Sequence, residues 1–221
     1  MFQQQSAISR PASAILETNK VLRNTYSLLS MTLIFSAVMA YIGIAMNLTQ
    51  GMGLVSTIVG IVMLWFVLPR TANSTSGIPV IFAITGLLGL GLAPMLNYYL
   101  AMDTNIVMTA FGGTGVIFLG LSGYALTTRK DFSFMAGFLM VGMFVVIGAA
   151  LVSIFVDIPA LSLAISAVVV IIMSGFILYQ TSSIINGGET NYIMATASLF
   201  LSLLNLFTAL LHLLSAFSGR D

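Results

Sequence analysis

The sequence predicts an all-α membrane protein with seven transmembrane helices, and three observations support this fold class. Seven apolar stretches, each long enough to cross a bilayer, occur within 221 residues. A spanning helix needs about 20 mostly apolar residues, so seven such helices account for most of the chain. Hydrophobic residues make up 59% of the composition and charged residues only 6%, whereas a soluble domain carries about 25% charged residues.

Each predicted span is an apolar run with polar or charged residues at its ends. The spans are predicted at 25–48, 52–68, 77–101, 106–127, 133–156, 159–180 and 190–217. The connections between them are short, so consecutive helices are expected to pack antiparallel. Residues 1–24 are interpreted as a cytoplasmic N-terminal tail, and residues 25–221 as one transmembrane domain.

Residues that favour helix ends lie at several of these boundaries. Asp131 is predicted to cap the fifth helix and Asp157 the sixth, because a carboxylate accepts from free backbone amides at a helix start. Gly187 is predicted to end the sixth helix, because glycine tolerates the left-handed conformation of a C-cap. Thr190 or Asn191 then caps the seventh helix.

Basic residues predict the orientation of the chain. Six of the seven fall on one side of the predicted bundle: Arg10, Lys20, Arg23, Arg70, Arg129 and Lys130. Lys and Arg are in excess in cytoplasmic loops, which predicts a cytoplasmic N-terminus and a periplasmic C-terminus. The first 24 residues lack the apolar segment and cleavage site of a signal peptide, so the first span is expected to act as an uncleaved insertion signal.

Small residues recur along the third, fourth and fifth spans. They are Gly86, Gly89, Gly91, Gly112, Gly113, Gly115, Gly120, Gly123, Gly137, Gly142, Gly148, Ala149 and Ala150. Lipid provides no hydrophobic drive for helices to associate, so close approach at small residues supplies the packing. We expect ordinary tight packing at these positions rather than a moving seam, and Pro94 is expected to kink the third helix.

The seventh span carries a polar face formed by Ser198, Ser202, Asn205, Ala209 and His212, at offsets of 4, 7, 11 and 14 residues from the first. This spacing is one side of an α-helix, and polar groups are costly in lipid. The face is therefore expected to turn into the bundle or a wet cavity. It either forms interhelical hydrogen bonds, worth about 0.6 to 2 kcal/mol each, or lines a path for protons or cations.

Composition and motifs exclude several functions. His212 is the only histidine, cysteine is absent, and no paired carboxylates or Ser/His/Asp grouping occur, so no enzymatic activity, metal or cofactor is expected. The net charge of +1 excludes a broad basic surface for nucleic acid. The polar cluster Tyr179–Ser183 at the end of the sixth span is interpreted as a helix end that meets water.

Three segments are distinctive: the stretch KVLRNTYSLLS (20–30), the loop TTRKD (127–131) and the run LYQTSSIINGGETNYIMATASLFLSLLNLF (178–207). They resemble the Bax inhibitor-1 family, closest to its proteobacterial YccA branch. The resemblance implies seven helices with the seventh enclosed by the other six. Calcium-leak members carry two carboxylates that share a proton at the positions matching Gln180 and Ser202. Both residues are uncharged here, which disfavours a pH-gated calcium leak.

The YccA branch implies association with the membrane-anchored protease FtsH and its partners HflK and HflC, as a slowly degraded substrate that restrains the protease. Gln3, Gln4, Gln5 and Ser6 then form the candidate recognition segment of a polar tail. A frayed terminus is the alternative interpretation. Residues 15–26 are also compatible with a helix along the membrane surface.

Three functional hypotheses follow from the sequence. The first is an inner-membrane modulator of the FtsH–HflK–HflC protease complex, surrounded by membrane lipids. The second is a proton or cation leak channel through the core around the seventh helix, with Gln180, Ser198, Ser202, Asn205 and His212 as its polar positions. The third is a purely structural subunit of the protease complex.

Overall fold

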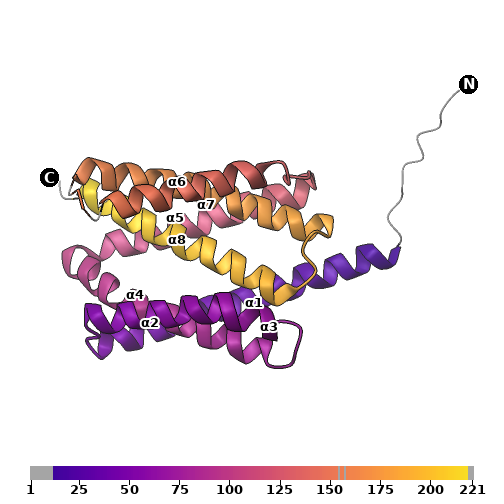
Figure 1. Ribbon diagram of the computed structural model, residues 1–221, viewed down its shortest axis with the longest axis horizontal. Coiled ribbons are helices and arrows are strands. Elements are labelled where there is room, and N and C mark those ends of the chain that lie inside the picture. Colours follow the sequence, from indigo (N-terminus) through magenta and orange to yellow (C-terminus); the bar gives the residue numbers. More distant parts are fainter. Residues whose placement is uncertain (1–11, 154, 157, 219–221) are drawn as a thin grey trace, which may run out of the picture.

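The protein is a helical bundle in a computed structural model that describes residues 12–153, 155–156 and 158–218 (Figure 1). The helices are α1 (Ala12–Ala45), α2 (Gln50–Val62), the π-turn η1 (Met63–Val67), α3 (Leu68–Thr71), α4 (Gly77–Met102), α5 (Thr104–Thr128), α6 (Met135–Ser153), α7 (Pro159–Asn186) and α8 (Tyr192–Ser218). Because α2, η1 and α3 are continuous, these described residues form seven helices long and apolar enough to cross a membrane. The predicted fold class is confirmed.

Helix α1 begins well before the predicted first span. It starts at Ala12, so the predicted helical conformation of residues 15–26 is confirmed. The first turns of α1 project beyond the other helices at one end of the bundle (Figure 1). The candidate recognition residues Gln3, Gln4, Gln5 and Ser6 lie outside the described residues.

The second span contains a local change of helix type. Residues 63–67 form a π-turn immediately before Pro69, which lies in α3. In a continuous α-helix the proline ring would clash with the carbonyl four residues earlier, here that of Trp65. Trp65 lies within the π-turn, whose wider backbone spacing makes room for the proline ring. The span continues to Thr71 instead of ending at 68 as predicted.

Helix α7 extends to Asn186, beyond the predicted end at 180. The interpretation of Tyr179–Ser183 as a helix end in water is therefore wrong. Thr181 and Ser182 are 0% and 1% exposed, and their hydroxyls have partners inside the bundle. The helix ends at Gly187, whose φ of 78° is the left-handed conformation predicted for this C-cap.

The predicted caps differ in their outcomes. The Asn191 side chain caps α8, since its Oδ1 accepts from the Ile193 backbone amide at 2.9 Å. Asp131 does not cap α6: its Oδ1 accepts from the Ser133 amide at 2.8 Å, within the turn before the helix. Asp157 lies outside the described residues.

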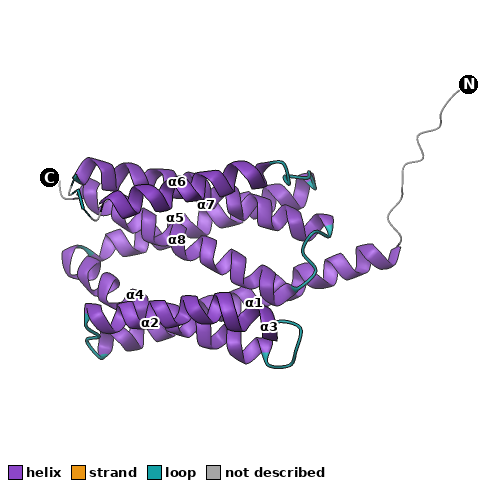
Figure 2. Ribbon diagram, viewed as in Figure 1, coloured by secondary structure: helices purple, strands orange, loops and turns teal. Residues whose placement is uncertain are grey.

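The helices form two groups with α8 between them. One group contains α1, α2, η1, α3 and α4, and the other contains α5, α6 and α7, while α8 crosses diagonally from one group to the other (Figure 1). The connections are short and lie at the two ends of the bundle (Figure 2). The start of α1 and the end of α8 therefore lie at opposite ends.

Helix α8 has the largest buried share of the seven candidate spans in the described chain, at 44% of its most apolar window. Its main neighbours are α1, α4, α5 and α7. Four helices thus provide most of the contacts around α8, whereas the family resemblance implies that all six other helices enclose it. The position of α8 makes it the principal connection between the two groups.

Glycines support close packing on α4 but, at most positions, not on α5 and α6. A Cβ at Gly89 would overlap the Ser36 carbonyl oxygen of α1, and one at Gly91 would overlap the Thr57 hydroxyl of α2. The expectation of tight packing is therefore confirmed on α4. It is wrong for the following glycines, where a Cβ would meet nothing within 4 Å: Gly112, Gly115, Gly120, Gly123, Gly137 and Gly148.

This contrast predicts opposite effects of the same substitution on two helices. Gly89→Ala is expected to lower the free energy of unfolding by about 1–3 kcal/mol, because the methyl group forces α1 away from α4. The control Gly112→Ala enters open space and is expected to be neutral or to stabilise by up to about 1 kcal/mol. Thermal unfolding in mild detergent measures both variants. Equal destabilisation would contradict the helix packing described above.

Candidate functional site

Hydroxyl and amide side chains meet where α1, α5, α7 and α8 come together, and we call Tyr26, Ser122, Gln180, Thr181 and Ser202 the polar junction. The Tyr26 hydroxyl of α1 lies 3.2 Å from Thr181 Oγ1 of α7. Ser122 Oγ of α5 lies 3.4 Å from the same Thr181 oxygen. One buried hydroxyl of α7 thus connects helices from both groups.

The second part of the polar junction joins α7 to α8. Ser202 Oγ donates to Gln180 Oε1 at 3.1 Å and lies 3.1 Å from the Ser198 carbonyl oxygen of its own helix. Ser202 is buried, whereas Gln180 and Ser198 are half-buried. The two positions that matched the family's acidic pair are therefore in direct contact, but neither side chain titrates in the physiological range.

Helix α1 also contacts α8 through backbone and hydroxyl groups. Thr196 Oγ1 donates to the Tyr192 carbonyl at 2.7 Å and lies 3.3 Å from the Thr25 carbonyl of α1. Within the described part of the chain, Thr25 Oγ1 is buried and has no hydrogen-bond partner. An unsatisfied buried hydroxyl costs about 1–3 kcal/mol, so the Thr25 hydroxyl lowers the stability of the fold.

The loop between α5 and α6 is tied to α7 by two side chains. Ser182 Oγ donates to the Lys130 carbonyl at 2.9 Å and accepts from the Phe132 amide at 3.0 Å. Asn186 Nδ2 donates to the Ser182 carbonyl at 3.0 Å and lies 3.4 Å from the Lys130 carbonyl. The polar cluster of α7 therefore positions a loop at the end of the bundle where α1 begins.

His212 lies near the opposite end of α8 and contacts α7. Its Nδ1 is 3.0 Å from Ser166 Oγ, and its Nε2 is 3.4 Å from Ser162 Oγ. Ser166 Oγ also donates to the Ser162 carbonyl at 3.0 Å. Both ring nitrogens are engaged, as expected for a hydrogen-bonded histidine rather than a metal ligand.

The predicted polar face of α8 does not form one continuous lining. Ala209 is buried, but Asn205 is exposed and donates to the Leu201 carbonyl of its own helix at 2.9 Å. Asn205 is therefore not buried in the bundle, which leaves only the wet cavity of the two surroundings predicted for this face. Ser202 and His212 are separated by ten residues of helix, about 15 Å along the axis, and they bond to different parts of α7.

The structure brings together some predicted positions and adds others. It joins Gln180, Ser202 and Ser198, and it separates them from His212 and Asn205. Tyr26 and Ser122 were not predicted as site residues, because a hydroxyl on a different span gives no signal of its partner. Among the described residues, no group of three His, Asp or Glu residues is arranged to hold a metal ion.

Comparison with known proteins gives this geometry its context. The family model described as inhibitor of apoptosis-promoting Bax1 matches residues 18–219. The chain belongs to the Bax inhibitor-1 family. The match includes α1 from Thr18 onward and all later helices, so the polar junction lies entirely within the family's domain.

Three relatives show how far the similarity extends. The Escherichia coli K12 protein named modulator of FtsH protease YccA is 50% identical over 214 residues, covering 96% of this chain and 97% of that protein. An uncharacterized Vibrio cholerae membrane protein is 48% identical over 223 residues, covering 100% of this chain and 98% of that protein. An uncharacterized Pseudomonas aeruginosa protein is 45% identical over the full length of both chains.

The contact between positions 180 and 202 predicts the effect of introducing two carboxylates. In the double variant Gln180→Glu with Ser202→Asp, the two groups are expected to share one proton. The protonated pair is favoured in the folded state, so stability is lost as the pH rises, between about pH 5 and pH 8. Thermal unfolding across this range measures the effect.

The two single variants are the controls for this prediction. Each buries one carboxylate, whereas the double variant at high pH adds repulsion between two charges. Its loss of stability should therefore exceed the sum of the single losses. An additive result would mean that the side chains at 180 and 202 are not in contact.

Proposed function

We propose that this chain is a modulator of an FtsH-type protease in the bacterial inner membrane, acting as a slowly degraded substrate and binding partner. The observation that carries the proposal is the 50% identity, over 96% of the chain, to the E. coli protein named modulator of FtsH protease YccA. The family resemblance adds HflK and HflC as neighbours of the protease. This role belongs to protein quality control and requires no catalytic residue.

Charge distribution supports a cytoplasmic N-terminus and a periplasmic C-terminus. Five described basic residues lie at the end of the bundle where α1 begins: Lys20, Arg23, Arg70, Arg129 and Lys130. Asp103 lies between α4 and α5 at the opposite end. Since Lys and Arg are concentrated in cytoplasmic loops, the end with the start of α1 faces the cytoplasm in our proposal.

The position of α1 suggests how proteolysis can begin and why it would be slow. The start of α1 projects from the proposed cytoplasmic end (Figure 1), where a protease in that compartment can reach it. Pulling on α1 then acts directly on its contacts with α4, α7 and α8. Because these neighbours belong to both helix groups, extraction of the first helix must disrupt the whole bundle.

The contacts of the polar junction favour this role over an ion leak. Ser202 and Gln180 bond to each other, and Asn205 is exposed and bonds to its own helix. A hard cation such as calcium prefers carboxylate oxygens, and the junction offers only neutral groups. A pH-gated leak through a shared proton would need a titratable pair at 180 and 202, where this chain has an amide and a hydroxyl.

The proposal predicts that degradation begins at the N-terminus. Deleting residues 2–11, which precede α1, is expected to lengthen the lifetime of the protein several-fold in cells that contain the protease. The deletion keeps Lys20 and Arg23, so insertion and orientation should be retained. A pulse-chase experiment compares the two lifetimes.

The matched control for this experiment removes residues 219–221 at the other end of the chain. This end is periplasmic in our proposal, so its removal should leave the lifetime unchanged. Equal lifetimes for the N-terminally shortened and full-length chains, with both still bound to the protease, would show that degradation begins elsewhere. A longer lifetime after the C-terminal deletion would contradict the proposed orientation.

A further inference from the structure

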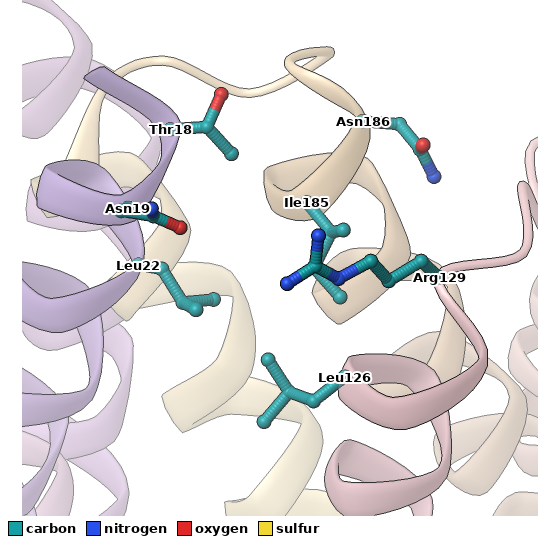
Figure 3. A pocket seen from close by; sticks show the side chains of 7 residues that line it. All are labelled: Thr18, Asn19, Leu22, Leu126, Arg129, Ile185 and Asn186. Carbon is teal, nitrogen blue, oxygen red and sulfur yellow. The ribbon is translucent and has the colours of Figure 1, made fainter. Parts of the chain in front are cut away.

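A cavity of about 340 Å³ lies between α1, α5 and α7 at the end of the bundle where α1 begins (Figure 3). Its polar lining consists of Thr18 and Asn19 from α1, Arg129 after α5, and Asn186 from α7. Its apolar lining consists of Leu22, Leu126 and Ile185. Among the described residues that line the cavity there is no carboxylate, and Arg129 is the charged one.

The lining changes from polar to apolar along the direction of the membrane. On each of the three helices, the apolar residue lies deeper in the span than its polar neighbour: Leu22 follows Asn19, Leu126 precedes Arg129, and Ile185 precedes Asn186. The same order occurs in an amphiphile at a membrane surface, where a polar headgroup meets an apolar chain. The cavity therefore fits a ligand with both parts.

Arg129 extends its guanidinium into the cavity, toward the helix that carries Asn19 and Leu22 (Figure 3). A guanidinium remains charged at physiological pH and donates two parallel hydrogen bonds to a phosphate group. The Thr18 hydroxyl and the Asn19 amide provide further donors on the opposite wall. The site thus offers one fixed positive charge and neutral donors from a second helix.

The backbone of Arg129 is unusual for this residue type. Its φ of 50° lies in the left-handed region, which glycine occupies at the matching C-cap of α7. Residues that carry a Cβ atom disfavour this left-handed conformation, so arginine is energetically costly at this position. The next carbonyl, that of Lys130, is held by Ser182 and Asn186, so the turn keeps Arg129 directed at the cavity.

We propose that this cavity binds a phosphate group, and that its occupant is the headgroup of an anionic phospholipid. The site lies at the end of three membrane-spanning helices, where headgroups are found, and anionic lipids are attracted to basic groups beside the membrane. The apolar floor accommodates the start of an acyl chain. The lipid joins the first turns of α1 to the ends of α5 and α7.

The test uses purified full-length protein in neutral detergent, with thermal unfolding as the measurement. The probes are a short-chain phosphatidylglycerol, the matched phosphatidylcholine and inorganic phosphate. Phosphatidylglycerol is expected to raise the unfolding temperature in a saturable way. Arg129→Gln should weaken half-saturation by about tenfold or more, because a charge-assisted pair is lost, whereas Lys130→Gln removes an adjacent charge outside the cavity and should bind as the wild type does.

Arg129→Gly separates binding from folding. Glycine relieves the left-handed backbone at this position, so this variant should unfold at a higher temperature without lipid and yet lose the lipid response. Equal responses of wild type and Arg129→Gln, or equal losses in Arg129→Gln and Lys130→Gln, would overturn the proposal. A response to phosphatidylcholine or inorganic phosphate that matches phosphatidylglycerol would overturn the assignment of an anionic lipid.

Discussion

Contacts along α8 hold together two groups of helices that are surrounded by lipid. Inside a bilayer an apolar side chain gains little by leaving lipid for another helix, so the connection must come from close packing and from hydrogen bonds. Ser202 bonds to Gln180 on α7, and Thr196 reaches the α1 backbone. Thr181 adds a buried hydroxyl shared by α1 and α5. The arrangement of the remaining helices depends on these few polar contacts and on the position of α8 between the groups.

The polar junction is built from uncharged side chains only. The contact between positions 180 and 202 links α7 to α8 through an amide and a hydroxyl. Such a contact stabilises the fold at every pH in the physiological range. In our proposal, contacts of this kind slow the unfolding of the bundle after a protease has engaged the start of α1.

The spans and the family were predictable from the sequence, because apolar length and local motifs are properties of single segments. The contacts that each polar residue makes with other helices were not predictable from the sequence. Thr181 and Ser182 looked like a helix end in water, but hydroxyls on α1 and α5 and the loop after Arg129 satisfy them inside the bundle. Asn205 has the same helical spacing as Ser202 yet is exposed. The glycines of α5 resemble those of α4 in sequence, and only the placement of neighbouring helices shows that their faces are open.

We propose that this bundle restrains a membrane protease by occupying it. The most direct measurement is the degradation rate of an unrelated membrane substrate by purified FtsH in liposomes, with increasing amounts of this chain in the same bilayer. We expect a saturable slowing that is overcome by excess substrate, together with slow loss of the chain itself. An unchanged degradation rate at saturating amounts of the chain, with the protease still active on the substrate, would contradict it.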